Sequence, residues 1–300
     1  LRVAGDEWTN QGPVALRWES DRLIIESLHM ASRLGDLRAS GRIDLRGALD
    51  VRVDGRFPLH QLPALLPEIR EAGGTLVVTG GIGGSLAAPQ PSGEATIQGG
   101  MLQLRDRPET LRDLEARLLI SPGGLRLTEA TASIGRGRIR ASGDLALAGW
   151  RPEAYRVLAI GNNIALAPLD GLQTTWDFDL ELVGRGAQRL LRGEGRLLQG
   201  RYTGRWNLVE MLLSRQAGPT GDVSPAIPIQ IALRLNDNLR IDTNWARLQV
   251  GGRLSLEGTT ARPIVLGSLA SQEGRITFRK HRWDVSSAAV RFADPRRIDP

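Results

Sequence analysis

The most constraining feature of this sequence is an alternation of apolar and polar side chains that recurs along most of its 300 residues. In residues 37–53, LRASGRIDLRGALDVRV, every second position is apolar or glycine, and almost all positions between them are charged or polar. Successive side chains of a β-strand point to opposite faces, so a period of two predicts strands with one apolar and one polar face. Residues 176–182, 227–236 and 247–257 show the same period, which indicates an all-β chain.

Only two stretches have a helical pattern, residues 59–72 and residues 205–216. Pro63 and Pro67 must break or kink the first, because proline lacks the N–H that a helix interior requires. The second stops before a Gly-Pro pair at residues 218–219. We therefore expect one or two short helices in an otherwise β structure.

The chain also repeats itself. Residues 35–47, 137–149 and 246–258 align without gaps and share glycines at two positions, which are Gly41, Gly143 and Gly252, then Gly47, Gly149 and Gly258. A second pattern spaces glycines by nine and then seven residues, at Gly84, Gly93 and Gly100, at Gly184, Gly193 and Gly200, and at Gly258, Gly267 and Gly274. Such repeats predict an elongated sheet in which each unit contacts mainly its neighbours. We expect residues 1–300 to form a single elongated, repeat-built β domain that is a fragment of a longer chain.

Composition excludes several classes of function. The chain has no cysteine, which rules out disulfides and thiolate metal ligands. Its net charge of +6 comes almost entirely from arginines spread along the alternating segments, a pattern typical of a solvated face and not of a nucleic-acid interface. No apolar run is long enough for a membrane-spanning helix.

Catalytic and metal sites are also not expected. The three histidines, His29, His60 and His281, are far apart in the sequence, without metal-ligand spacing. The acidic series at residues 177–181 alternates with apolar residues, which favours a solvated face over calcium ligands. No nucleophile elbow is present, and the glycines at residues 80–84 are not followed by the Lys-Ser or Lys-Thr of a phosphate-binding loop. We expect no enzyme activity, no cofactor and no metal.

The carboxy-terminal segment, residues 258–300, resembles the carboxy-terminal region of the TamB family, the inner-membrane component of the translocation and assembly module in the AsmA-like group. The resemblance lies in an ordered series of residues: Pro263, Gly267, Gly274, the Arg275-Ile276-Thr277-Phe278 strand, Trp283, Val285, Val290-Arg291-Phe292 and Pro300. Residues 62–104 are similar to the repeating unit of that family, so the resemblance covers most of the chain. The chain stops where the family normally continues into further terminal strands, whose function is not carried over.

The resemblance implies a long antiparallel sheet curled into an open trough with an apolar interior. It also implies a periplasmic location, with an anchor in the inner membrane through an amino-terminal segment outside this fragment. The implied function is a non-enzymatic bridge that carries phospholipid between the inner and outer membranes. Moving an acyl tail of roughly 15 methylenes into water costs about 12 kcal/mol of free energy, at about 0.8 kcal/mol per methylene. An apolar lining would remove most of this cost and therefore suits this role.

We expect the groove to be lined by the apolar members of the alternating segments. These are Leu37, Ile43, Leu45, Val51, Val53, Ile139, Leu145, Leu147, Trp176, Phe178, Leu180, Leu182, Ile229, Ile231, Leu233, Leu248, Val250, Leu254, Leu256, Ile276 and Phe278.

Two other functions are open to test. The first is a scaffold that assists outer-membrane protein assembly by strand addition, beside an outer-membrane barrel partner, TamA, which the family resemblance implies. The second is a carbohydrate-processing β-helix enzyme, which would need carboxylates clustered on a groove, and the scattered acidic residues argue against it.

Overall fold

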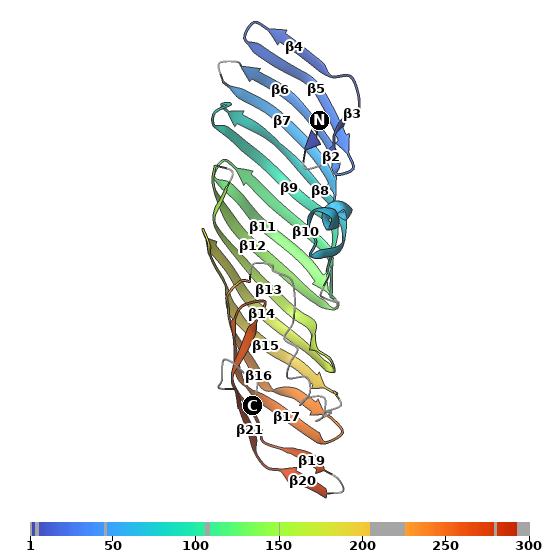
Figure 1. Cartoon of the computed structure of the whole chain (residues 1–300), viewed down its shortest axis with the longest axis vertical. Helices are drawn as coiled ribbons and strands as arrows, with labels where there is room; N and C mark the ends of the chain where they lie inside the picture. The colour runs from blue at the N-terminus through green and yellow to red at the C-terminus, as the bar shows by residue number, and fades with distance from the viewer. Residues whose placement is uncertain are drawn as a thin grey trace. The chain divides into compact units, whose positions relative to one another are not determined.

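The computed structural model describes residues 2–3, 6–44, 47–105, 109–149, 151–204, 226–278 and 281–292. These residues form β-strands almost throughout, with one short helical segment (Figure 1). The chain separates into two compact units, the first made of Leu1–Gly135 and Ile139–Val157, the second of Arg136–Arg138 and Leu158–Pro300. Among the described residues, no helix combines the length and apolar character needed to span a membrane.

Most strands of the first unit lie beside the strand that follows them in the chain. They are β1 (Arg2–Val3), β2 (Asp6–Glu7), β3 (Thr9–Asn10), β4 (Ala15–Glu19), β5 (Arg22–Ser32), β6 (Gly35–Asp44), β7 (Leu49–Pro58), β8 (Ile69–Gly84), β9 (Pro89–Leu104), β10 (Thr110–Ser121), β11 (Gly124–Ile134), β12 (Gly137–Ala148) and the first part of β13 (Arg151–Leu169). From β4 to β11, each strand pairs antiparallel with the next, as the blue to green arrows of Figure 1 show.

A short helical segment interrupts the strands between β7 and β8. It consists of a 3₁₀ turn, η1 (Leu59–Gln61), and one turn of α-helix, α1 (Leu62–Leu65). Leu59 is buried with Ile69 and Ala72 of β8 in a small core. The prediction of a helix over residues 59–72 is therefore wrong beyond residue 65, because Ile69 and the residues after it pair with β9. The second predicted helix, residues 205–216, lies outside the described residues.

The second unit contains the rest of β13 and eight further strands. These are β14 (Leu172–Arg185), β15 (Gln188–Tyr202), β16 (Ile229–Asp242), β17 (Ala246–Gly258), β18 (Pro263–Ser271), β19 (Gly274–Phe278), β20 (His281–Val285) and β21 (Ala288–Phe292). One end of β17 pairs with β18 and the other end with β19. Strand β18 also pairs with β21, and strand β19 also pairs with β20.

One pair of strands departs from the antiparallel prediction. Strand β16 pairs parallel to β15, with Leu191 beside Ile229 and Tyr202 beside Ile241. A parallel pair needs a crossover connection and not a hairpin. Sequence alternation carries no information about strand direction, so it could not predict this pair. Apart from this pair, the fold-class prediction is confirmed, because the chain is an all-β protein built on an open, mainly antiparallel sheet.

Repeated glycines lie in the middle of strands, where side chains would collide with the next strand. At Gly41 of β6, φ is +144°, and a Cβ atom would lie 2.1 Å from the carbonyl oxygen of Asp50. At Gly193 of β15, φ is +153°, and a Cβ atom would lie 2.1 Å from the carbonyl oxygen of Asp179. Glycine alone adopts this backbone conformation readily and leaves room for such close approach. These glycines therefore allow local bends within long strands.

Candidate functional site

Apolar side chains of the first unit line up in rows that run across the strands. Cross-strand partners lie side by side on one face of a sheet, so the pairing register identifies each row. One row crosses from β5 to β11 through Leu28, Ala39, Val53, Gly80, Gly93, Ile120 and Leu125. The next row crosses the same strands through Met30, Leu37, Gly55, Val78, Ala95, Leu118 and Leu127. We call the face that carries these rows, and the corresponding face of the second unit, the apolar face.

Most of the predicted groove residues of the first unit occupy this face. Leu37 and Val53 lie in the two rows above, Ile43 pairs with Leu49, and Val51 pairs with Ile82. All four are half-buried. On β12, the predicted residues are likewise half-buried and alternate with exposed neighbours; they are Ile139, Leu145 and Leu147. Leu45 lies outside the described residues.

Rows of the second unit follow the same rule. One row crosses β14, β15, β16, β17, β18 and β21 through Phe178, Gly195, Leu233, Leu254, Gly267 and Phe292. A neighbouring row contains Leu180, Gly193, Ile231, Leu256 and Val265. A third contains Leu182, Leu191 and Ile229, and a fourth contains Leu172, Tyr202, Ile241, Leu248, Gly274 and Val285.

The remaining predicted residues lie beside these rows. Trp176 pairs with Leu197, and its ring stacks on Phe178 with a centroid distance of 5.8 Å. Val250 is buried and pairs with Leu239. Ile276 pairs with Trp283, and both side chains are exposed. Phe278 is the partner of His281 in the β19–β20 pair, and its side chain is outside the described part of the structure.

Glycines within the rows make space for the large side chains next to them. A Cβ atom at Gly195 would lie 3.1 Å from a ring carbon of Phe178 and 2.8 Å from Cδ2 of Leu233. The phenyl ring and the leucine therefore lie over the glycine backbone. This alternation of large and small residues flattens the apolar face and keeps its surface apolar.

Within the described part of the chain, no second layer covers the rows of the first unit in the way that the two sheets of a sandwich cover each other. In a closed sandwich, the inward-facing side chains interdigitate and lose nearly all contact with water. Most of the row residues on β6, β7, β10, β11 and β14 are half-buried, whereas Ile229 and Ile231 of β16 are buried, at 4% and 9% exposure. The rows thus retain apolar surface that a further molecule can cover.

The opposite face is polar and carries ion pairs between neighbouring strands. On the β14–β15 hairpin, Arg196 contacts Asp177 at 2.7 Å and Arg192 contacts Glu181 at 2.6 Å. The hydrogen bond from Arg196, together with one from the backbone N–H of Asn163, lowers the pKa of Asp177. Two carboxylates of the acidic series at residues 177–181, Asp177 and Glu181, therefore have arginine partners on this face. Within the described chain, no cluster of three or more His, Asp and Glu side chains is arranged to hold a metal ion.

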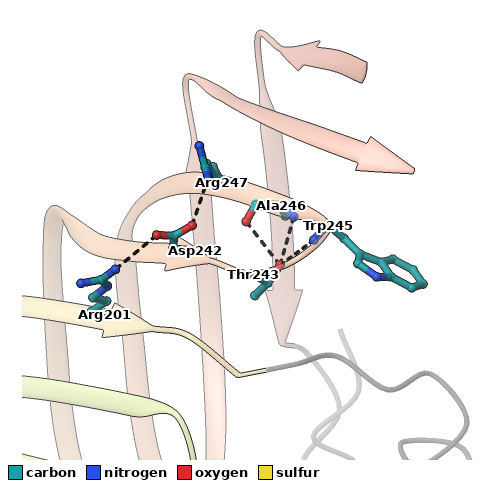
Figure 2. A network of polar contacts seen from close by, with 6 residues as sticks. All are labelled: Arg201, Asp242, Thr243, Trp245, Ala246 and Arg247. Carbon is teal, nitrogen blue, oxygen red and sulfur yellow. Dashed lines mark hydrogen bonds and ion pairs between the residues drawn. The ribbon is translucent and has the colours of Figure 1, made fainter. Parts of the chain in front are cut away.

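A polar network ties β15, β16 and β17 together (Figure 2). Asp242 at the end of β16 accepts contacts from Arg201 of β15 at 3.3 Å and from Arg247 of β17 at 3.2 Å. The Thr243 hydroxyl accepts hydrogen bonds from the backbone N–H groups of Trp245 and Ala246, which holds the turn into β17. Figure 2 shows the indole of Trp245 pointing away from this network. Asp242 thus connects both neighbours of β16, including its parallel partner.

Sequence reasoning missed much of the apolar face on β5 and on β8 to β11. On β5, a register shift between Ile25 and Leu28 breaks the period of two. On β8, Val77 is apolar although it lies on the polar face, and this hides the alternation of apolar and polar residues along the strand. On β10, the alternation from Leu114 to Leu118 is clear, so the period of two could have revealed its apolar face.

The fold and this face together define a repeat-built β-sheet protein with one apolar and one polar face. Residues 209–300 match the family model of the TamB C-terminal domain. This match confirms the resemblance over the carboxy-terminal part of the chain and supports a role in the TamB/AsmA-like machinery of the cell envelope. No curated protein and no solved structure matches the chain.

Proposed function

We propose that this chain is a non-enzymatic conduit that carries phospholipid between the inner and outer membranes along its apolar face. The observation that carries the proposal is the continuity of the rows. In the first unit, two rows cross every strand from β5 to β11 without a charged residue. The rows are also left half-buried, so acyl chains have a surface to cover.

The free energy of contact with this surface favours movement of an acyl chain along the rows over tight binding at one place. Removing apolar surface from water contributes about 25 cal/mol per Å², wherever along the rows that surface lies. Successive strands are about 4.8 Å apart, so an acyl chain that moves by one strand exchanges one set of Leu, Ile and Val contacts for an equivalent set. A lining of this kind lowers the free-energy cost of moving an acyl chain out of the membrane, and the apolar rows themselves do not bind the headgroup.

A matched pair of substitutions on one strand tests the proposal. Leu233 and Ala232 are neighbours on β16, and Leu233 lies in a row whereas Ala232 is exposed on the polar face. We expect Leu233→Asp to reduce the phospholipid that co-purifies with the protein several-fold, as measured by mass spectrometry. Ala232→Asp introduces the same charge and is expected to leave the lipid content unchanged. Circular dichroism spectra of both variants report whether the strands are retained.

Lipid-free wild-type protein, or equal lipid content in the two folded variants, would rule out the conduit. The same pair is applied to transfer of a fluorescent phospholipid between donor and acceptor vesicles. In that assay, the rate should fall for Leu233→Asp only.

A second candidate function is assistance to outer-membrane protein assembly by strand addition. The observation in its favour is strand β4, where Leu16 is 56% exposed and Trp18 is 58% exposed. A photocrosslinking residue in place of Trp18 would then capture an unfolded outer-membrane protein strand. Capture that is unchanged by Leu233→Asp would separate this function from lipid transport.

A further inference from the structure

A pocket of about 860 Å³ lies at the turn end of the β14–β15 hairpin in the second unit. Its volume is within the range of about 300–1,000 Å³ that is usual for small-ligand sites. Val183 and Leu190 form its half-buried wall, and Pro228, just before β16, closes one side. Arg185 and Arg189 also line it. We call it the Arg185–Arg189 pocket.

The charge of this pocket is unbalanced. Further along the same hairpin, Arg192 and Arg196 each contact a carboxylate. Among the described residues, Arg185 and Arg189 have no carboxylate partner and no acidic side chain lines the pocket. Three other pockets on the described surface each contain at least two carboxylates. The Arg185–Arg189 pocket is therefore complementary to an anion.

The position of the two arginines relates the pocket to the apolar face. Strand alternation puts Arg189 on the face of Leu191, whereas Arg185 shares the opposite face with Val183 and Leu190. The pocket thus lies at the margin of the sheet, where a ligand reaches both faces. Immediately inside this margin is the row of Leu182, Leu191 and Ile229. A molecule with an anionic head and apolar tails can place its head in the pocket and its tails on that row.

We propose that the Arg185–Arg189 pocket binds the phosphate of an anionic glycerophospholipid whose acyl chains lie on the apolar face. Guanidinium groups form paired, charge-assisted hydrogen bonds with phosphate oxygens, which a lysine cannot reproduce. Val183 and Leu190 add apolar surface to the pocket, so we expect it to bind a lipid headgroup more tightly than free phosphate. This inference rests on the proposed function, because it names the class of lipid that the conduit prefers.

The test uses the whole chain and dihexanoylphosphatidylglycerol, a short-chain lipid, below its micelle concentration. We expect the double variant Arg185→Gln/Arg189→Gln to weaken binding at least tenfold by calorimetry. Arg138→Gln/Arg140→Gln is the matched control, because these exposed arginines of β12 also have no carboxylate partner in the described structure and their loss removes the same charge. The control should weaken binding less than twofold. Inorganic phosphate should bind wild-type protein at least tenfold more weakly than the lipid does.

Equal losses in the two double variants would overturn the inference, as would inorganic phosphate that binds as tightly as the lipid. The lipid that co-purifies separates this inference from the proposed function. If the Arg185→Gln/Arg189→Gln variant keeps the total amount of lipid but a smaller anionic fraction than wild type, both stand. If amount and anionic fraction are unchanged, the inference fails and the conduit stands. If wild-type protein carries no lipid, the conduit itself fails.

Discussion

Substitution of Gly193 by alanine is expected to destabilise the second unit far more than a single added methyl group usually does. Gly193 lies in the middle of β15, at a φ of +153°. A Cβ atom there would lie 2.1 Å from the carbonyl oxygen of Asp179 and 2.9 Å from Cα of Leu180. Both neighbours are backbone atoms of the paired strand, so no side-chain rotation can relieve the collision.

The magnitude follows from two costs. Holding a residue other than glycine in a sparsely populated backbone region costs about 1–3 kcal/mol. Forcing extra atoms into a close contact costs about another 1–3 kcal/mol. A small shift of the backbone relieves part of both costs at once, so they do not add in full. We expect the free energy of unfolding to fall by about 3 kcal/mol. Gly123 in the β10–β11 turn is the control, because a Cβ atom there would have no neighbour within 4 Å.

Urea unfolding followed by circular dichroism measures both variants. Gly123→Ala should change the free energy of unfolding by less than about 1 kcal/mol, and a small gain is expected because alanine restricts the unfolded chain. If Gly193→Ala proves no more destabilising than Gly123→Ala, the assignment of Gly193 as a site of obligatory close strand approach is incorrect. The aligned glycines of the repeat would then need another explanation.

Two further predictions concern packing and pH. Leu197→Ala should lower the free energy of unfolding by about 3 kcal/mol, because Leu197 is 1% exposed and the truncation leaves a cavity. Leu198→Ala, at 39% exposure, should lower it by less than about 1 kcal/mol in the same urea titration. Similar losses for the two variants would contradict the burial of Leu197. The lowered pKa of Asp177 means that its carboxylate stabilises the fold above an unfolded pKa of about 3.9 and that this contribution is lost as the pH falls through the folded pKa. Asp177→Asn should therefore cost about 0.5–1 kcal/mol at pH 7 and almost nothing near pH 2, and an equal cost at both pH values would argue against the ion pair.

Alternation predicted the fold class because a period of two survives wherever a strand has one wet face. The segment from Leu49 to Val53 is such a case, and its residues lie on β7 with the predicted faces. The period fails where the backbone itself changes register, as between Ile25 and Leu28. It also fails where a strand is apolar on both sides, as at Val77 and Val78 of β8.

Other features depend on contacts that a single segment cannot encode. The parallel direction of β16 is set by its partner β15 and by the network through Asp242, neither of which appears in local pattern. Residues 69–72 have a helical period, yet their pairing with β9 prevails over it. The Arg185–Arg189 pocket likewise forms only when the hairpin end meets residues 226–228.

The half-buried rows also link ligand binding at the apolar face to the stability of the protein. A molecule that binds the folded chain, and not the unfolded one, stabilises it by an amount that grows with the concentration of that molecule. Few side chains of the described residues are fully buried, so the proposed lipid would add substantially to the apolar surface that is removed from water. If lipid binds as proposed, we expect lipid-free protein to melt at a lower temperature than lipid-bound protein.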